Sequence, residues 1–126
     1  MGHHGFIRVL LVDDNTVLRG MMRETLQMDT AMQIVDEAED GLIAIEKVEV
    51  LRPDIVIMDI HMPHVNGIAA TKHITTYYPS CVVIGVSTDN DRYTRIEMEK
   101  AGSSAFISKE HLESLPEVIK AISRTT

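Results

Sequence analysis

The sequence predicts a single α/β domain built on a parallel sheet. Apolar, β-rich runs alternate with segments of helical periodicity along all 126 residues, which is the order that gives a parallel sheet covered by helices on both faces. Three of the runs are continuously apolar, as expected for strands that are buried on both faces. The chain is long enough to bury one full core without disulfides.

Each predicted strand is a short run rich in valine and isoleucine, bounded by polar or turn-forming residues. The first, third and fourth runs are the continuously apolar ones, so we expect them in the middle of the sheet. The predicted strands lie near Ile7–Val12, Gln33–Ala38, Asp54–Met58, Val82–Val86 and Ser104–Ile107.

The first two predicted helices follow the first two strands. The first covers about Asn15–Met28, and the second follows Asp40-Gly41 and stops before Arg52-Pro53, because the residue ahead of a proline is steered out of the helical region. Their apolar side chains recur at helical spacing. The predicted core-facing residues are Val17, Leu18, Met21, Met22, Thr25 and Leu26 in the first helix, and Ile43, Ala44, Val48 and Leu51 in the second.

The remaining three helices carry recognisable start and stop signals. The third follows Asn66, a candidate N-cap, and the fourth spans roughly 91–101 and ends at Gly102, a residue typical of helix C-termini. The last has Ser114 as a candidate N-cap and Pro116 in its first turn, where the missing N–H costs little. Its apolar stripe consists of Leu115, Val118, Ile119 and Ile122.

Composition excludes several functional classes. The formal net charge of −7 makes the domain a poor nucleic-acid binder by itself. The lone Cys81 cannot form an intrachain disulfide, and we expect it to be a buried small hydrophobe. No apolar run approaches the ~20 residues of a membrane span, and no signal-peptide pattern is present, so a cytoplasmic location is expected. Residues 1–5 are interpreted as an N-terminal extension or tag remnant, and residues 6–126 as the domain.

Polar side chains with complementary chemistry follow four of the predicted strands. Asp13 and Asp14 come after the first, Asp59 after the third, Ser87 after the fourth and Lys109 after the fifth. The carboxyl ends of parallel strands share one edge of the sheet, where ligands bind. Three carboxylates, a hydroxyl and an ammonium at that edge indicate a site for a divalent cation and a phosphoryl group.

These motifs resemble the receiver domain of two-component response regulators over nearly the whole chain. Val9–Asn15 is similar to the family's first strand and acidic pair, and Ile57–Gly67 to its phosphoacceptor loop. The resemblance implies a flavodoxin-like, doubly wound sheet of five parallel strands in the order 2-1-3-4-5, with five helices. Three further segments resemble the NarL/FixJ subfamily in particular: Glu37–Gly41, Arg52–Asp54 and Ala105–Glu110.

The resemblance also implies a role for each residue at the strand ends. Asp59 would accept the phosphoryl group, since a carboxylate can form a covalent acyl phosphate. Mg²⁺, which relieves the repulsion of adjacent carboxylates, would be bound directly by Asp14 and Asp59, through water by Asp13, and by the backbone carbonyl of His61. Lys109 would neutralise a phosphoryl oxygen as a compact point charge. For an isolated acid or lysine, a capping or surface role is the ordinary alternative.

A second group of residues is expected to respond to phosphorylation. Ser87 would hydrogen-bond the phosphoryl group, although Thr88 is a neighbouring hydroxyl and a strand-end turn role is the alternative. Phe106 matches the family's aromatic switch position, and ordinary core burial is the competing interpretation. His61 and Asp89 would tune how long the phosphoryl group persists.

The function predicted from the resemblance is a phosphorylatable signalling switch that takes its phosphoryl group from a histidine kinase or phosphotransfer protein. It would not be an enzyme beyond self-phosphorylation and slow autodephosphorylation. The expected partners are that kinase and, after phosphorylation, a second copy of the chain. The chain would be the receiver of a transcriptional regulator, with DNA contacted only by a C-terminal domain that this chain lacks.

Two alternatives stay open. One is a single-domain or degenerate receiver that acts as a protein-interaction module. The other is a small Mg²⁺-dependent phosphatase that works through an aspartyl phosphate. The phosphatase is disfavoured because such enzymes generally need a second acid two residues after the nucleophile, where this chain has His61, and a substrate-covering cap for which there is no room.

Overall fold

A central parallel sheet organises the molecule. The structure is a computed structural model that describes residues 5–62, 65–88 and 92–124. The sheet has five strands in the order β2-β1-β3-β4-β5, and every neighbouring pair is parallel. The predicted flavodoxin-like order 2-1-3-4-5 is therefore confirmed. The strands are β1 (Ile7–Val12), β2 (Met32–Ala38), β3 (Ile55–Asp59), β4 (Val82–Ser87) and β5 (Ala105–Ser108).

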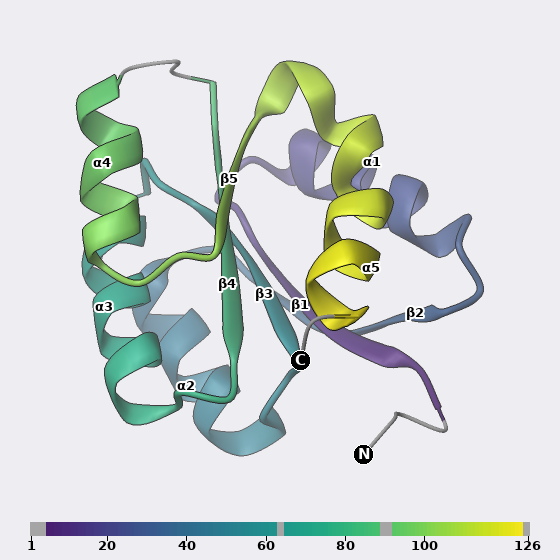
Figure 1. Ribbon diagram of the computed structural model, residues 1–126, viewed down its shortest axis with the longest axis horizontal. Coiled ribbons are helices and arrows are strands. Elements are labelled where there is room, and N and C mark those ends of the chain that lie inside the picture. The colour runs from purple at the N-terminus through teal and green to yellow at the C-terminus, as the bar shows by residue number, and fades with distance from the viewer. Residues whose placement is uncertain (1–4, 63–64, 89–91, 125–126) are drawn as a thin grey trace.

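Helices cover both faces of this sheet. In Figure 1, α1 and α5 lie on one face, and α2, α3 and α4 lie on the other. The predicted alternation of strands and helices is confirmed, with boundaries that move by one or two residues. The helices are α1 (Thr16–Gln27), α2 (Gly41–Leu51), α3 (Gly67–Tyr77), α4 (Arg92–Lys100) and α5 (Leu115–Arg124).

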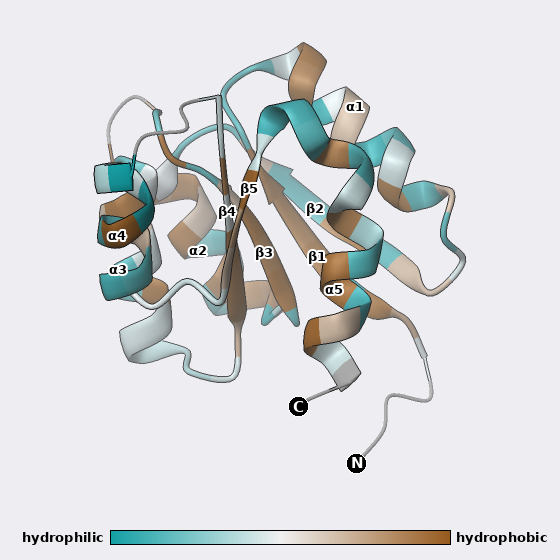
Figure 2. Cartoon of the chain, turned by 45° about the horizontal axis from the view of Figure 1, so that its top comes forward, coloured by the Kyte–Doolittle hydropathy of each residue, from teal (hydrophilic) through white to brown (hydrophobic). Residues whose placement is uncertain are grey.

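The core consists of two apolar layers, one on each face of the sheet. Side chains of a strand alternate between faces, so Val9 and Leu11 pack in the layer beneath α1 and α5, whereas Leu10 and Val12 pack in the layer beneath α2, α3 and α4. Figure 2 shows the resulting concentration of hydrophobic residues along the strands. Cys81 belongs to the second layer, as predicted, and burial raises the pKa of its thiol to about 12.

The first three helices start at side-chain caps in the strand-to-helix connections. The side chain of Asn15 accepts hydrogen bonds from Val17 and Leu18 N–H, and Asp40 and Asn66 cap α2 and α3 in the same way. These caps satisfy N–H groups that have no partner inside the helix.

The prediction for α1 was wrong at two positions. Val17 and Met21 are 71% and 49% exposed, whereas Met22 and Leu26 are fully buried. The apolar residues of this helix form a stripe wider than its contact with the sheet, so only the side of the stripe that holds Met22 and Leu26 reaches the core.

The connection between β5 and α5 was not foreseen. A short 3-10 helix, η1 (Lys109–Ser114), begins directly after β5. Ser114 does precede α5, but its hydroxyl donates a hydrogen bond to the carbonyl of His111 at 2.7 Å.

Among the described residues, no helix is both long enough and apolar enough to cross a bilayer.

Candidate functional site

The register of the sheet brings the predicted site residues to one edge. Val12 pairs with Met58, so Asp13 and Asp59, the next residues along the chain, lie side by side. Asp59 is itself paired with Val86, which places Ser87 one step further along β4. Ser87 pairs with Ser108, and Lys109 follows directly. Four separate strand ends thus meet at the carboxyl edge of the sheet, which lies towards the top of Figure 1.

Three carboxylates form the centre of this edge. One carboxylate oxygen from each of Asp13, Asp14 and Asp59 lies within 4.8 Å of the other two. Asp13 and Asp59 are buried, and Asp14 is exposed. Carboxylates this close repel one another unless a cation or a proton intervenes.

Lys109 supplies a positive charge between the two buried acids. Its Nζ lies 2.9 Å from Asp13 Oδ2 and 3.0 Å from Asp59 Oδ1, and its side chain is 9% exposed. Burial alone would lower the pKa of this ammonium, but its hydrogen bonds and charge interactions with Asp13 and Asp59 outweigh burial and raise it. Lys109 is therefore a cation that bridges the two strands. We call Asp13, Asp14, Asp59 and Lys109 the acidic edge.

The pKa of the Asp59 carboxyl lies above its ordinary value. Burial, and then the neighbouring charge of Asp13, raise this pKa to about 6, although the Lys109 ammonium opposes the shift. One ammonium does not neutralise three carboxylates. The edge is therefore short of positive charge at neutral pH, and a bound cation would lower the pKa of Asp59 again.

The residues fit a magnesium ion. Asp13 Oδ2 is buried, and the contact found for it among the described residues is the Lys109 ammonium at 2.9 Å. Mg²⁺ is a hard cation that prefers oxygen ligands and commonly takes one or two carboxylates together with water. The exposed Asp14 leaves the cluster open to solvent on one side. His61, whose backbone carbonyl is the fourth predicted ligand, is exposed and lies two residues beyond Asp59.

A close backbone contact shapes the loop beyond Asp59. The N–H of Gly67 donates to the carbonyl of Ile60 at 2.9 Å. A Cβ atom at Gly67 would overlap the carbonyl oxygen of Asp59. Glycine is thus required here because α3 starts in direct contact with the backbone of the candidate phosphoacceptor.

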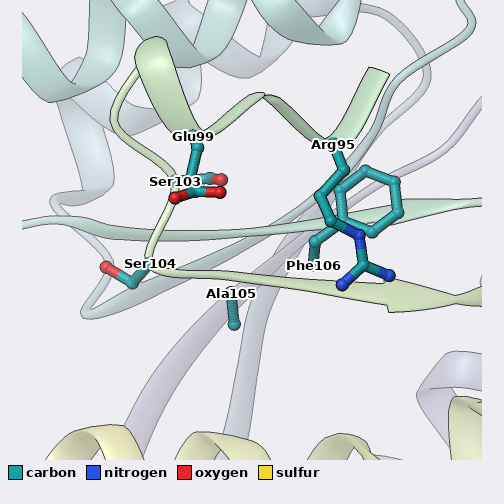
Figure 3. A pocket seen from close by; sticks show the side chains of 6 residues that line it. All are labelled: Arg95, Glu99, Ser103, Ser104, Ala105 and Phe106. Atoms are coloured by element: carbon teal, nitrogen blue, oxygen red, sulfur yellow. The ribbon is translucent and has the colours of Figure 1, made fainter. Parts of the chain in front are cut away.

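The predicted switch residues lie on β4 and β5: Ser87 ends β4 at the carboxyl edge, and Phe106 lies two residues before the end of β5. Ser87 is fully buried, whereas Thr88 is exposed, so the two neighbouring hydroxyls differ in their surroundings. Phe106 is half-buried: its ring lies against α4, and the Arg95 guanidinium sits 5.1 Å from the ring centroid. Figure 3 shows the two side chains together at one end of a surface pocket. The pocket, which we call the α4–β5 pocket, is lined by Arg95, Glu99, Ser103, Ser104, Ala105 and Phe106.

One prediction about the site lies outside the described residues, and one contact was missed. Asp89, predicted to tune the phosphoryl lifetime, is outside the described ranges. The missed contact is made by Arg19, whose Nη1 donates to the backbone carbonyl of Asp13 at 2.5 Å. An arginine in the first turns of a helix gives no sequence signal for such a contact, since most arginines there point into solvent.

Comparisons with known proteins agree on one family. Residues 9–122 match the response regulator receiver domain. The chain is 33% identical over 94% of its length to the transcriptional regulatory protein DegU of Brevibacillus brevis, and covers 50% of that protein. It is 40% identical over 83% of its length to a protein-glutamate methylesterase/protein-glutamine glutaminase of Thermotoga maritima, of which it covers 31%.

Structural comparison gives the same result for the fold. The receiver domain of the putative response regulator NarL from Mycobacterium tuberculosis superposes with a TM-score of 0.91, at 20% identity, over 97% of this chain and 99% of that one. The chain spans half or less of the two curated relatives, whose names describe different functions. The match over residues 9–122 nevertheless covers most of the chain, which therefore belongs to the response regulator receiver domain family.

Proposed function

We propose that this domain is a Mg²⁺-dependent phosphorylation switch whose phosphoacceptor is Asp59. Phosphorylation-controlled switching is the general function of receiver domains, which are generally not enzymes in their own right. The observation that carries the assignment to Asp59 is its position: it is a buried carboxylate held 3.0 Å from the Lys109 ammonium, with two further acids within 4.8 Å.

The chemistry follows from the acidic edge. A carboxylate oxygen of Asp59 attacks the phosphorus of a phosphohistidine on a sensor kinase or phosphotransfer protein, so that an O–P bond forms while the N–P bond breaks and the imidazole leaves. Lys109 offsets negative charge that develops on the phosphoryl oxygens. Mg²⁺ would be held directly by Asp14 and Asp59, through water by Asp13, and by the backbone carbonyl of His61. The ion would supply charge neutralisation for phosphoryl transfer.

The domain's response would arise on β4 and β5. Ser87 is buried and lies one residue beyond Val86, the strand partner of Asp59. A phosphoryl group on Asp59 would therefore lie within reach of the Ser87 hydroxyl. Phe106 lies on the neighbouring strand, β5. Movement of these two side chains would change the α4–β5 pocket and promote a homodimer. Light scattering with and without beryllofluoride tests this step, and an unchanged mass at high protein concentration with the mimic bound would contradict it.

The output of the switch is proposed from the relatives. DegU is a transcriptional regulator and the Thermotoga maritima relative is a methylesterase, and the chain covers 50% and 31% of them. The similarity to NarL-type receivers favours a cytoplasmic transcriptional regulator that contacts DNA through a separate C-terminal domain. A single-domain or degenerate receiver is the second candidate.

Incubation with an acyl-phosphate donor, read by intact mass, tests the proposal. With Mg²⁺ we expect a gain of roughly 80 Da, the mass of one phosphoryl group, and no gain when EDTA replaces Mg²⁺. No gain under either condition would contradict the switch and favour an inert interaction module. Release of many equivalents of phosphate per chain would favour a phosphatase instead.

A further inference from the structure

Arg19 makes two contacts that link α1 to the acidic edge. Its Nη1 donates to the backbone carbonyl of Asp13 at 2.5 Å, and its Nε donates to Glu37 Oε1 at 2.8 Å. The side chain is 16% exposed. A guanidinium offers several N–H donors in a fixed planar fork, so an anchor on Glu37 also sets where the remaining N–H groups point.

Glu37 reaches α1 because β2 contains a bulge. Val9 pairs with Ile34 but Leu10 pairs with Asp36, so Val35 is an extra residue in β2. A shift of one residue moves a side chain to the opposite face of a sheet. The bulge thus puts Glu37 in register with Leu11, on the face that α1 and α5 cover.

A second arginine fixes the same carboxylate. Arg23 donates from Nε to Glu37 Oε2 at 2.5 Å and from Nη2 to Oε1 at 2.7 Å. The hydrogen bond from Arg23 is the main reason why the pKa of Glu37 lies below its ordinary value, and burial opposes the shift. Glu37 is therefore a charged, oriented anchor, and Arg19 is the one of its two arginines that also contacts the turn after β1.

That turn is held by one backbone hydrogen bond and one side-chain hydrogen bond. The Asp13 N–H donates to the carbonyl of Ala38 at 3.0 Å, and Asp13 Oδ1 accepts from Asn15 N–H at 2.8 Å. Within the described ranges, no hydrogen bond or ion pair holds the carboxylate of Asp14. The direction of the Asp14 side chain thus depends on the Asp13–Asp14 peptide, whose carbonyl is the group that Arg19 binds.

We propose that Arg19 is a positioning residue for magnesium binding. Held by Glu37, it fixes the Asp13–Asp14 peptide and thereby keeps the Asp14 carboxylate beside Asp13 and Asp59. This inference rests on the proposed function, because it assigns Arg19 a part in the Mg²⁺ site described above. Removing a partner that orients a metal ligand typically weakens metal affinity by about ten- to a hundred-fold.

Arg23 provides a matched control. It binds the same carboxylate as Arg19 but makes no contact with the Asp13 carbonyl among the described residues. Arg19→Met and Arg23→Met each remove one cation from Glu37, so a general loss of stability or of positive charge affects both. Arg19→Lys keeps the charge but loses the fork that reaches two acceptors at once.

The experiment compares Mg²⁺ affinity by calorimetry in the wild type and the three variants. We expect Arg19→Met to weaken affinity about tenfold or more, Arg19→Lys to recover only part of the loss, and Arg23→Met to stay within about twofold of the wild type. Equal loss in Arg19→Met and Arg23→Met would overturn the proposal, as would full recovery in Arg19→Lys.

A second measurement needs no metal and separates this inference from the proposed function. In EDTA, backbone amide exchange should accelerate at Asn15, whose N–H binds Asp13 Oδ1, in Arg19→Met and not in Arg23→Met. Unchanged exchange at Asn15 in Arg19→Met would overturn the positioning role even if Mg²⁺ binds. Wild-type protein that binds no Mg²⁺ would instead contradict the proposed function, whatever the exchange data give.

Discussion

The acidic edge and the α4–β5 pocket lie at opposite ends of β5 and are held by different contacts. At the acidic edge, Lys109 bridges two buried carboxylates at 2.9 and 3.0 Å, and hydrogen bonds fix the backbone on both sides of Asp13. At the pocket, Phe106 is half-buried and is covered by an exposed arginine 5.1 Å from its ring centroid. Ion pairs dominate the first region, whereas in the second Phe106 packs against the apolar layer beneath α2, α3 and α4.

The two regions are therefore suited to different tasks, phosphoryl transfer and switching. Phosphoryl transfer needs reacting groups in a fixed geometry, which a network of ion pairs can provide. A switch needs an element with two arrangements of similar free energy, which loosely packed side chains at a surface can provide. The predictions below test whether charge governs one region and packing the other.

The largest expected effect is the loss of phosphorylation in Asp59→Asn. The amide is close in size to the carboxylate but is not a nucleophile towards phosphorus, so we expect no mass gain from an acyl-phosphate donor. Asp54→Asn is the control, because Asp54 lies just ahead of the same strand, where its carboxylate accepts the Arg8 N–H at 2.8 Å. Labelling of Asp59→Asn at the wild-type level would exclude Asp59 as the acceptor.

The next largest effect concerns the cation that joins the two buried acids. Lys109→Met should lower the free energy of unfolding by about 3–5 kcal/mol at pH 7.5, since it leaves buried carboxylates without their partner. Lys120→Met removes an ammonium that pairs with Asp29 but is 32% exposed, and should cost less than about 1 kcal/mol. Urea denaturation of both variants measures the difference. Equal losses would mean that charge is no more important at the acidic edge than elsewhere on the surface.

The raised pKa of Asp59 predicts a pH-dependent difference between the wild type and Asp59→Asn in EDTA. With a folded-state pKa of about 6 and an ordinary value of 3.8, the protonated carboxyl is favoured by folding. Protonation of Asp59 therefore stabilises the folded state fully below about pH 4, and this stabilisation is lost as the pH rises through 6. The advantage of Asp59→Asn should therefore grow between these values, to on the order of 3 kcal/mol at pH 7.5. A difference that stays constant from pH 4 to 7.5 would contradict the raised pKa.

A smaller effect separates the two acids of the turn. Mg²⁺ at ten times its Kd should stabilise the wild type by about 1.4 kcal/mol, because it binds the folded state alone. The resulting increase in Tm should shrink more in Asp14→Ala than in Asp13→Ala, if Asp14 binds the ion directly and Asp13 binds it through water. Thermal denaturation with Mg²⁺ and with EDTA measures the increments. The same increment in all three proteins would exclude this pair from the site.

The sequence predicted most of the fold because hydrophobic runs and caps are local signals. The gathering of Asp13, Asp59 and Lys109 at one edge followed from the expectation of a parallel sheet. Strand order needed the family resemblance as well, since no local signal specifies which strands pair. The wrong assignment of Val17 and Met21 and the missed contact of Arg19 have a common cause. Both depend on how α1 is rotated and placed against the sheet, and this is set by tertiary contacts such as the bulge in β2 that presents Glu37.

A glycine-to-alanine substitution can be made in both regions, and the smallest effect is expected at Gly85. A Cβ atom at Gly85 would lie 2.7 Å from Met98 Cε and 3.5 Å from Phe106 Cδ2. Met98 Cε is the end of a flexible side chain and can move. Gly85→Ala should therefore change stability by no more than about 1 kcal/mol, because the gain from replacing a strand glycine offsets mild overpacking.

Gly67→Ala is the matched change at the acidic edge, where the new Cβ meets the Asp59 carbonyl oxygen, a backbone atom that cannot move aside alone. We expect Gly67→Ala to lower Mg²⁺ affinity and phosphorylation by about tenfold or more, since displaced metal ligands bind far less well. Gly85→Ala should leave both within about twofold while shifting the NMR signals of the Phe106 ring. If Gly85→Ala also weakened Mg²⁺ binding tenfold, the two regions would be one mechanical unit, and packing at β4 and β5 would contribute to the chemistry as well as to the response.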